Sequence, residues 1–106
     1  MEIKSYRSEE YGVTAYNMVD VIRWNMIQEL RKKWSMISST EYILSYPLGV
    51  IRLVEVDYYY DLYINKELIQ KGIDNIDEAT EIAFEHLEKI RHDTIEMRNF
   101  FISLDK

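Results

Sequence analysis

The sequence predicts an α+β fold in which two long helices flank a small antiparallel sheet of three to four strands and pack on one of its faces. Toward both ends of the chain, apolar residues return at alternating spacings of three and four, which is typical of amphipathic helices. Between about residues 40 and 69, Thr, Tyr, Ile and Val dominate and this spacing disappears, which is typical of strands. The order helix, strands, helix places both helices on one side of the sheet.

Residues 1–106 are expected to form one globular domain, because 106 residues can bury a core without disulfides or a metal. Residues 1–12 are polar and without clear periodicity, which indicates a loose arm or a short strand. The chain contains no cysteine. It also lacks a signal-peptide pattern and any apolar run near the ~18 residues of a membrane span, so a cytoplasmic location is expected.

The first helix is expected over residues 14–37. Basic residues at 31–33 interact favourably with the negative end of the helix dipole, and the Ser/Thr run at 38–40 indicates that the helix has ended. Its apolar stripe consists of Val19, Ile22, Met26, Leu30, Trp34 and Ile37.

Two strands are expected over residues 40–46 and 50–56, joined by a turn with Pro47 at its second position and Gly49 at its fourth. A further hairpin is expected around Asn65 and Lys66, since asparagine tolerates the positive φ of a tight two-residue turn. The stretch 57–61 contains no glycine, proline or asparagine. It therefore predicts either one long bent strand or two strands joined through the tyrosines.

The second helix is expected to run without a break from Asn75 to Ser103, about 40 Å at ~1.5 Å per residue. Asn75 followed by Glu78 forms a capping box that satisfies backbone N–H groups of the first turn. The apolar stripe of this helix consists of Ile76, Ala79, Ala83, Leu87, Ile90, Thr94, Met97 and Phe101.

The acidic residues are concentrated in the C-terminal half. Through residue 53 there are seven Lys/Arg against six Asp/Glu, a charge of +1; beyond it there are six against thirteen, a charge of −7, which gives the total of −6. This argues against direct nucleic-acid binding and favours a basic protein partner. The candidate surface is the acidic helix face formed by Glu78, Glu81, Glu85, Glu88 and Glu96.

The tyrosine-rich hairpin is the second candidate surface, because tyrosine combines a large contact area with a hydrogen-bonding tip and is enriched at interfaces. Three consecutive tyrosines cannot all point into one core, so at least one should face a partner. The residues concerned are Asp57, Tyr58, Tyr59, Tyr60 and Asp61.

No motif for catalysis or for a cofactor stands out, so the sequence favours a non-enzymatic, acidic interaction module without a cofactor. The composition is rich in Ile, Lys, Glu, Tyr and Asn, which is typical of proteins encoded by AT-rich genomes such as those of low-GC bacteria, their plasmids or their phages. It is compatible with an inhibitor or regulator from a phage or mobile element. Its glutamate column could then imitate a row of nucleic-acid phosphates. Two alternatives stay open. The first is a structural homodimer built on the long helical seams. The second is a metal-assisted hydrolase using Glu55, Asp57 and Asp61, which are separated by even numbers of residues and would therefore place three carboxylates on one face of a continuous strand.

Overall fold

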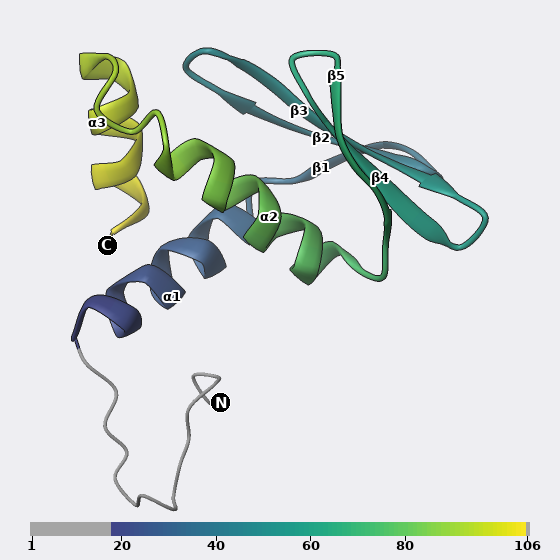
Figure 1. Cartoon of the computed structure of the whole chain (residues 1–106), viewed down its shortest axis with the longest axis horizontal. Coiled ribbons are helices and arrows are strands. Elements are labelled where there is room, and N and C mark those ends of the chain that lie inside the picture. Colours follow the sequence, from purple (N-terminus) through teal and green to yellow (C-terminus); the bar gives the residue numbers. More distant parts are fainter. Residues whose placement is uncertain (1–17, 106) are drawn as a thin grey trace, which may run out of the picture.

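The computed structural model describes residues 18–105, which form three helices and one five-stranded sheet (Figure 1). The expectation for residues 1–12 lies outside this part of the chain. The α+β class is confirmed, with five strands in place of three to four and three helices in place of two. The elements in chain order are α1 (Met18–Arg31), β1 (Ser35–Ser38), β2 (Glu41–Tyr46), β3 (Gly49–Val56), β4 (Tyr59–Ile64), β5 (Glu67–Ile73), α2 (Ile76–Glu88) and α3 (Ile95–Leu104).

The sheet is an antiparallel meander in which every strand pairs with the next one along the chain, in the order β1-β2-β3-β4-β5. Each connection within it has two residues, as the closing pairs Tyr46–Gly49, Val56–Tyr59 and Ile64–Glu67 show. Two-residue connections force each strand back along its neighbour. The sheet is therefore built from local pairings alone.

The end of the predicted first helix was wrong, because residues 35–38 form strand β1. The helix ends at Arg31, and β1 then pairs with β2 through Ser35 opposite Ile43 and Met36 opposite Tyr42. Ile37 fits a helical stripe by spacing only. In the folded chain the unpaired edge of β2 offers backbone hydrogen bonds to this segment, and that tertiary pairing overrides a weak local preference.

The turn around Asn65 and Lys66 is confirmed, with φ values of 51° and 74°. The same turn geometry recurs at Asp57 and Tyr58, with φ values of 54° and 73°. This settles the ambiguity around residues 57–61, since the chain makes two strands joined through Asp57 and Tyr58.

The single long C-terminal helix was also wrong, because it breaks into α2 and α3. Turn hydrogen bonds follow α2, from the N–H of Ile90 to the oxygen of Leu87 and from the N–H of Asp93 to that of Ile90. Thr94, placed in the apolar stripe by spacing, is instead the N-cap of α3, and its hydroxyl oxygen accepts from the N–H of Met97 at 3.0 Å. The break folds α3 back, and three of its side chains reach the core: Met97, Phe101 and Leu104.

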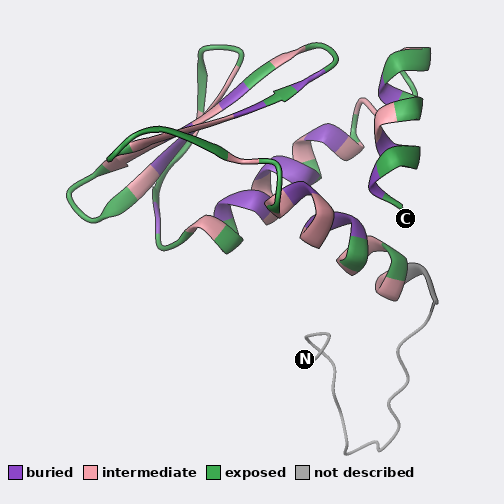
Figure 2. Ribbon diagram, turned by 180° about the vertical axis from the view of Figure 1, so that it is seen from behind, coloured by how far each residue is buried: buried purple, intermediate pink, exposed green. Residues whose placement is uncertain are grey.

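The core lies between one face of the sheet and the helices, which gather on one side of it (Figures 1 and 2). Helices α1 and α2 are antiparallel, since ion pairs join Arg31 to Asp77 at one end and Arg23 to Glu88 at the other. Much of each helical seam is covered by the other helices, whereas Ile22 of α1 stays exposed. The fully buried larger side chains include Leu30, Leu44, Ile51, Leu53, Leu62, Ile73, Phe84, Leu87 and Phe101.

Candidate partner-binding surface

A shallow cleft lies where the turn between β3 and β4 meets the beginning of α2. Its volume is about 330 Å³, and it is open to solvent on one side. The tyrosine-rich hairpin lies on one side of it and the beginning of α2 on the other, and no residue of the predicted acidic helix face is among those that line it. The residues that line this acidic cleft are Arg31, Tyr58, Tyr60, Asp74, Asn75, Ile76 and Asp77.

Tyr58 occupies an unusual backbone position at the tip of the hairpin. Its φ of 73° lies in the left-handed region, which costs a residue with a bulky side chain about 1–2 kcal/mol. Glycine is the residue that this turn position favours. The side chain nevertheless stays 89% exposed, so the strain is not offset by burial. A strained residue that presents an aromatic ring to solvent is a candidate contact for a partner.

Tyr60 forms the inner wall of the acidic cleft, and its ring is held in place by Tyr42. The two ring centroids are 6.5 Å apart in an edge-on arrangement. Burial raises the pKa of the Tyr60 hydroxyl, and the nearby Glu55 carboxylate raises this pKa further. Tyr60 is therefore a neutral hydrogen-bonding group at physiological pH. Tyr59 points to the opposite sheet face, because side chains alternate along a strand, and is half exposed.

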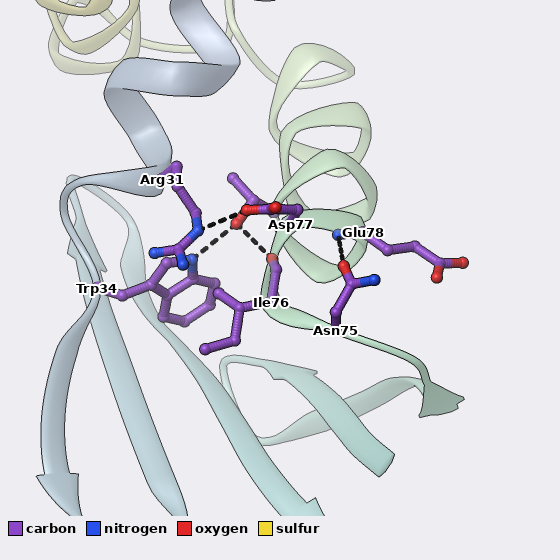
Figure 3. A network of polar contacts seen from close by, with 7 residues as sticks. Arg31, Trp34, Asn75, Ile76, Asp77 and Glu78 are labelled. Atoms are coloured by element: carbon purple, nitrogen blue, oxygen red, sulfur yellow. Dashed lines mark hydrogen bonds and ion pairs between the residues drawn. The ribbon is translucent and has the colours of Figure 1, made fainter.

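The first turn of α2 supplies the acidic side of the cleft. The Asn75 side chain accepts a hydrogen bond from the backbone N–H of Glu78 at 2.8 Å, which confirms Asn75 as the N-cap (Figure 3). The reciprocal bond of the predicted capping box, from the Asn75 N–H to the Glu78 carboxylate, is absent within residues 18–105, and the Glu78 side chain points away from Asn75. Arg31 donates from Nε to Asp77 at 2.7 Å and fixes this turn against α1. Asp74 and Glu78 are exposed, and no ion pair involves either within residues 18–105.

Behind the cleft, a short chain of hydrogen bonds anchors α2 to the segment between α1 and β1 (Figure 3). The indole Nε1 of Trp34 donates to the hydroxyl oxygen of Thr80 at 2.9 Å. Thr80, which is fully buried, in turn donates to the backbone oxygen of Ile76 at 2.7 Å. This chain of bonds sets the position of the helix end that carries the acidic side of the cleft.

We expect the Thr80→Val substitution to lower the free energy of unfolding by about 1–2 kcal/mol, because it leaves the Trp34 indole N–H without its acceptor. Urea denaturation followed by tryptophan fluorescence measures this. A double-mutant cycle with Trp34→Phe isolates the bond between the two side chains. Strictly additive losses in the double variant would show that the bond contributes nothing.

The five predicted glutamates do not form one column. Glu78, Glu81 and Glu85 follow one another on α2, whereas Glu96 belongs to α3, beyond the break. Glu88 is engaged inside the fold, where both of its oxygens accept from Arg23 at 2.9 Å. The expected regular row of five carboxylates is therefore wrong.

Arg23 also changes the electrostatics of the acidic helix face. The hydrogen bond to Glu88 raises the pKa of the guanidinium, and the charges of Glu85 and Glu81 raise it further. A positive charge thus lies beside the C-terminal half of α2. The uncompensated negative charge gathers at its N-terminal end, next to the acidic cleft.

The carboxylates proposed for a metal-assisted hydrolase are not on one face. The turn at Asp57 separates the strands, and Glu55 lies opposite Tyr60 while Asp61 lies opposite Val54, so the two side chains point to opposite faces. Asp61 is nearly buried, and its Oδ1 accepts from the backbone N–H of Gly72 at 3.2 Å. Within the described part of the chain, no three His, Asp or Glu side chains are grouped as metal ligands would be.

Sequence reasoning missed Arg31, Asp74 and Asp77 as members of the site. The run of acidic residues around the Asn75 cap was a visible signal, because acids at 74, 77 and 78 surround a helix N-terminus. Their proximity to Tyr58 was not visible, since sixteen positions of chain separate Tyr58 from Asp74.

Comparison with models of known protein families, with curated proteins and with solved structures found no match. No helix among residues 18–105 combines the length and the apolar character that crossing a membrane requires.

Proposed function

We propose that this protein is a non-enzymatic interaction module that binds a basic segment of a partner protein in the acidic cleft. The observation that carries the proposal is Tyr58, an almost fully exposed aromatic residue held at a left-handed backbone position. Strain of this kind clusters at ligand-binding sites. Lys66 has the same backbone position, so what distinguishes Tyr58 is the exposed aromatic ring that it carries. Tyrosine is among the side chains that contribute most at protein interfaces.

The charges around Tyr58 select the chemistry of the partner. Asp74 and Asp77 line the cleft, and Asp57 and Glu78 are next to lining residues in the chain. Among residues 18–105 the one cation that lines it, Arg31, is already paired with Asp77. An incoming lysine or arginine side chain would meet uncompensated carboxylates, and its stem or guanidinium would pack on the tyrosine rings.

Glu81 and Glu85 extend the negative surface along α2 from the acidic cleft and would steer a basic partner toward it. Imitation of a nucleic acid is not part of this proposal, because it requires a regular row of free carboxylates. Glu88 is paired with Arg23, and Glu96 lies on another helix.

The test uses two substitutions at equivalent turn positions, Tyr58→Gly and Lys66→Gly. Both residues have φ near 74°, so glycine should relieve strain in each hairpin and raise the free energy of unfolding by about 1 kcal/mol. Only Tyr58→Gly removes the proposed contact. We expect it to weaken binding of a basic peptide about tenfold, while Lys66→Gly leaves binding unchanged or slightly tighter.

The probe is a hexalysine peptide, titrated into isotopically labelled protein and followed by amide chemical shifts, with hexaglutamate as the negative control. Binding at the acidic cleft predicts shift changes at residues 57–60 and 74–78 that weaken as salt rises from about 50 to 300 mM. Shift changes spread evenly over all acidic residues, or equal affinity of the two glycine variants, would overturn the proposal.

A further inference from the structure

A second pocket lies at the other end of α2, where the three helices meet. Its volume is about 220 Å³, larger than the ~150 Å³ cavity that can hold a benzene molecule. It opens toward solvent, unlike the sealed core beside it. Residues of all three helices and of the loop between α2 and α3 line it, among them Ile22, Met26, Phe84, Arg91, Phe101 and Ile102.

The helical pocket combines an apolar floor with a rim of isoleucines and charged side chains. Phe84 and Phe101 are fully buried and pack against each other, with ring centroids 5.5 Å apart. Ile102 stands at the rim with 67% of its surface exposed, and Ile22 is exposed beside it. An apolar ligand would cover surface that the chain alone leaves in water.

The two arginines of the pocket differ in whether a carboxylate of the protein pairs with them. Arg23 lies 5.2 Å from the Phe84 ring and is satisfied by a two-pronged ion pair with Glu88. Arg91 lies 4.6 Å from the Phe101 ring, and within residues 18–105 no carboxylate is within ion-pair distance of it. Asp105 lines the pocket as well but is not paired with Arg91.

We infer that the helical pocket binds a small apolar carboxylate, an aromatic or branched aliphatic acid of about ten non-hydrogen atoms. The apolar group would rest on the exposed Ile22 and Ile102 of the rim, above the buried rings of Phe84 and Phe101, and its carboxylate would accept hydrogen bonds from Arg91. A planar guanidinium that is weakly hydrated and stacked on a ring is well suited to hold a carboxylate with two parallel bonds. Asp105 also lines the pocket, so the preference for an acid rests on the donors of Arg91, which can hold a carboxylate with two hydrogen bonds and cannot accept one from an amine.

This inference is independent of the proposed function. The acidic cleft surrounds Asn75–Asp77, whereas the helical pocket surrounds Phe84 and Glu88, about three helical turns away along α2. Failure at one site leaves the other untouched.

The test titrates the labelled protein with phenylacetate, with neutral phenylacetamide and with cationic phenethylamine, up to about 10 mM each, and follows amide chemical shifts. We expect phenylacetate to shift residues of the helical pocket and to bind at least about fivefold tighter than the amide, with the amine weakest. Arg91→Gln should abolish the preference for the acid. Arg98→Gln is the matched control, since Arg98 lies on exposed α3 surface outside the pocket.

Equal binding of the acid and the amide would overturn the assignment of Arg91, and equal effects of the Arg91 and Arg98 substitutions would do so as well. No shift of pocket residues at the highest phenylacetate concentration would overturn the site altogether. As a second variant, Ile22→Trp places a large ring at the exposed rim, where folding tolerates it, and should displace phenylacetate by filling the pocket.

Discussion

The Phe84→Ala substitution should lower the free energy of unfolding by about 3–5 kcal/mol, the range for removing a fully buried aromatic side chain. Phe84 has no exposed surface and packs against Phe101 of α3, while Arg23 of α1 lies over its ring. Removing it leaves a cavity at the one point where all three helices meet. Urea denaturation measures the loss, provided that the slope of the unfolding free energy against urea concentration is the same in both proteins.

Ile95→Ala is the matched control, because Ile95 is equally apolar but 64% exposed at the first turn of α3. We expect it to change stability by no more than about 0.5 kcal/mol. A small effect of Phe84→Ala, similar to that of Ile95→Ala, would mean that the three helices do not close on one core. The comparison also reports whether α3 is docked, since the Phe84 contact with Phe101 exists only if it is.

Local chemistry made part of this fold predictable. The cap at Asn75 and the turn at Asn65 and Lys66 each depend on side chains within a few residues, so their signals survive in the sequence. The hairpin at Asp57 and Tyr58 has the same geometry, with an aspartate that tolerates positive φ at the first turn position but a tyrosine where glycine is favoured. Its turn is imposed by the pairing of β3 with β4, and the sequence could only leave two alternatives open.

The error in the C-terminal helix arose because spacing alone does not distinguish a continuous helix from two helices in series. Met97 and Phe101 keep the period of α2 across the break, yet they reach the core only because the chain turns after Lys89. Thr94 was the available signal, since threonine is a good N-cap and a poor residue for a helix interior. The segment 35–38 was misassigned because its strand partner, β2, determines its structure.

The sequence indicated which residue types would form the candidate site, but not which residues lie together in it. Tyr58 and Tyr60 were named from residue type, but the cleft that they line depends on the tertiary placement of α2 against β4 and β5. The pairing of Arg23 with Glu88 spans 65 positions and removes one predicted glutamate from the partner surface. Contacts of this range have no local signature.

Gly49→Ala should lower the free energy of unfolding by about 2–4 kcal/mol, because the new methyl group collides with a side chain that joins two hairpin turns. A Cβ at position 49 would lie 1.6 Å from Oδ1 of Asn65. That oxygen accepts from the N–H of Val50 at 2.9 Å, and Nδ2 of Asn65 donates to the Tyr46 hydroxyl at 3.0 Å and to the Leu48 carbonyl at 3.2 Å. Alanine would expel the asparagine and break all three hydrogen bonds.

Gly72→Ala separates this collision from the ordinary cost of replacing glycine. Gly72 has a φ of 68° and no atom within 4 Å of its would-be Cβ, so alanine there should cost only the backbone strain, about 1–2 kcal/mol. Asn65→Ala should lose the same three hydrogen bonds without any collision, and adding Gly49→Ala to it should then cost far less than in the parent chain. If the two losses simply add, the asparagine is not what excludes a side chain at position 49. Thermal or urea unfolding of the four variants decides this, and it tests whether one side chain in the β4–β5 turn fixes the register of the β2–β3 hairpin.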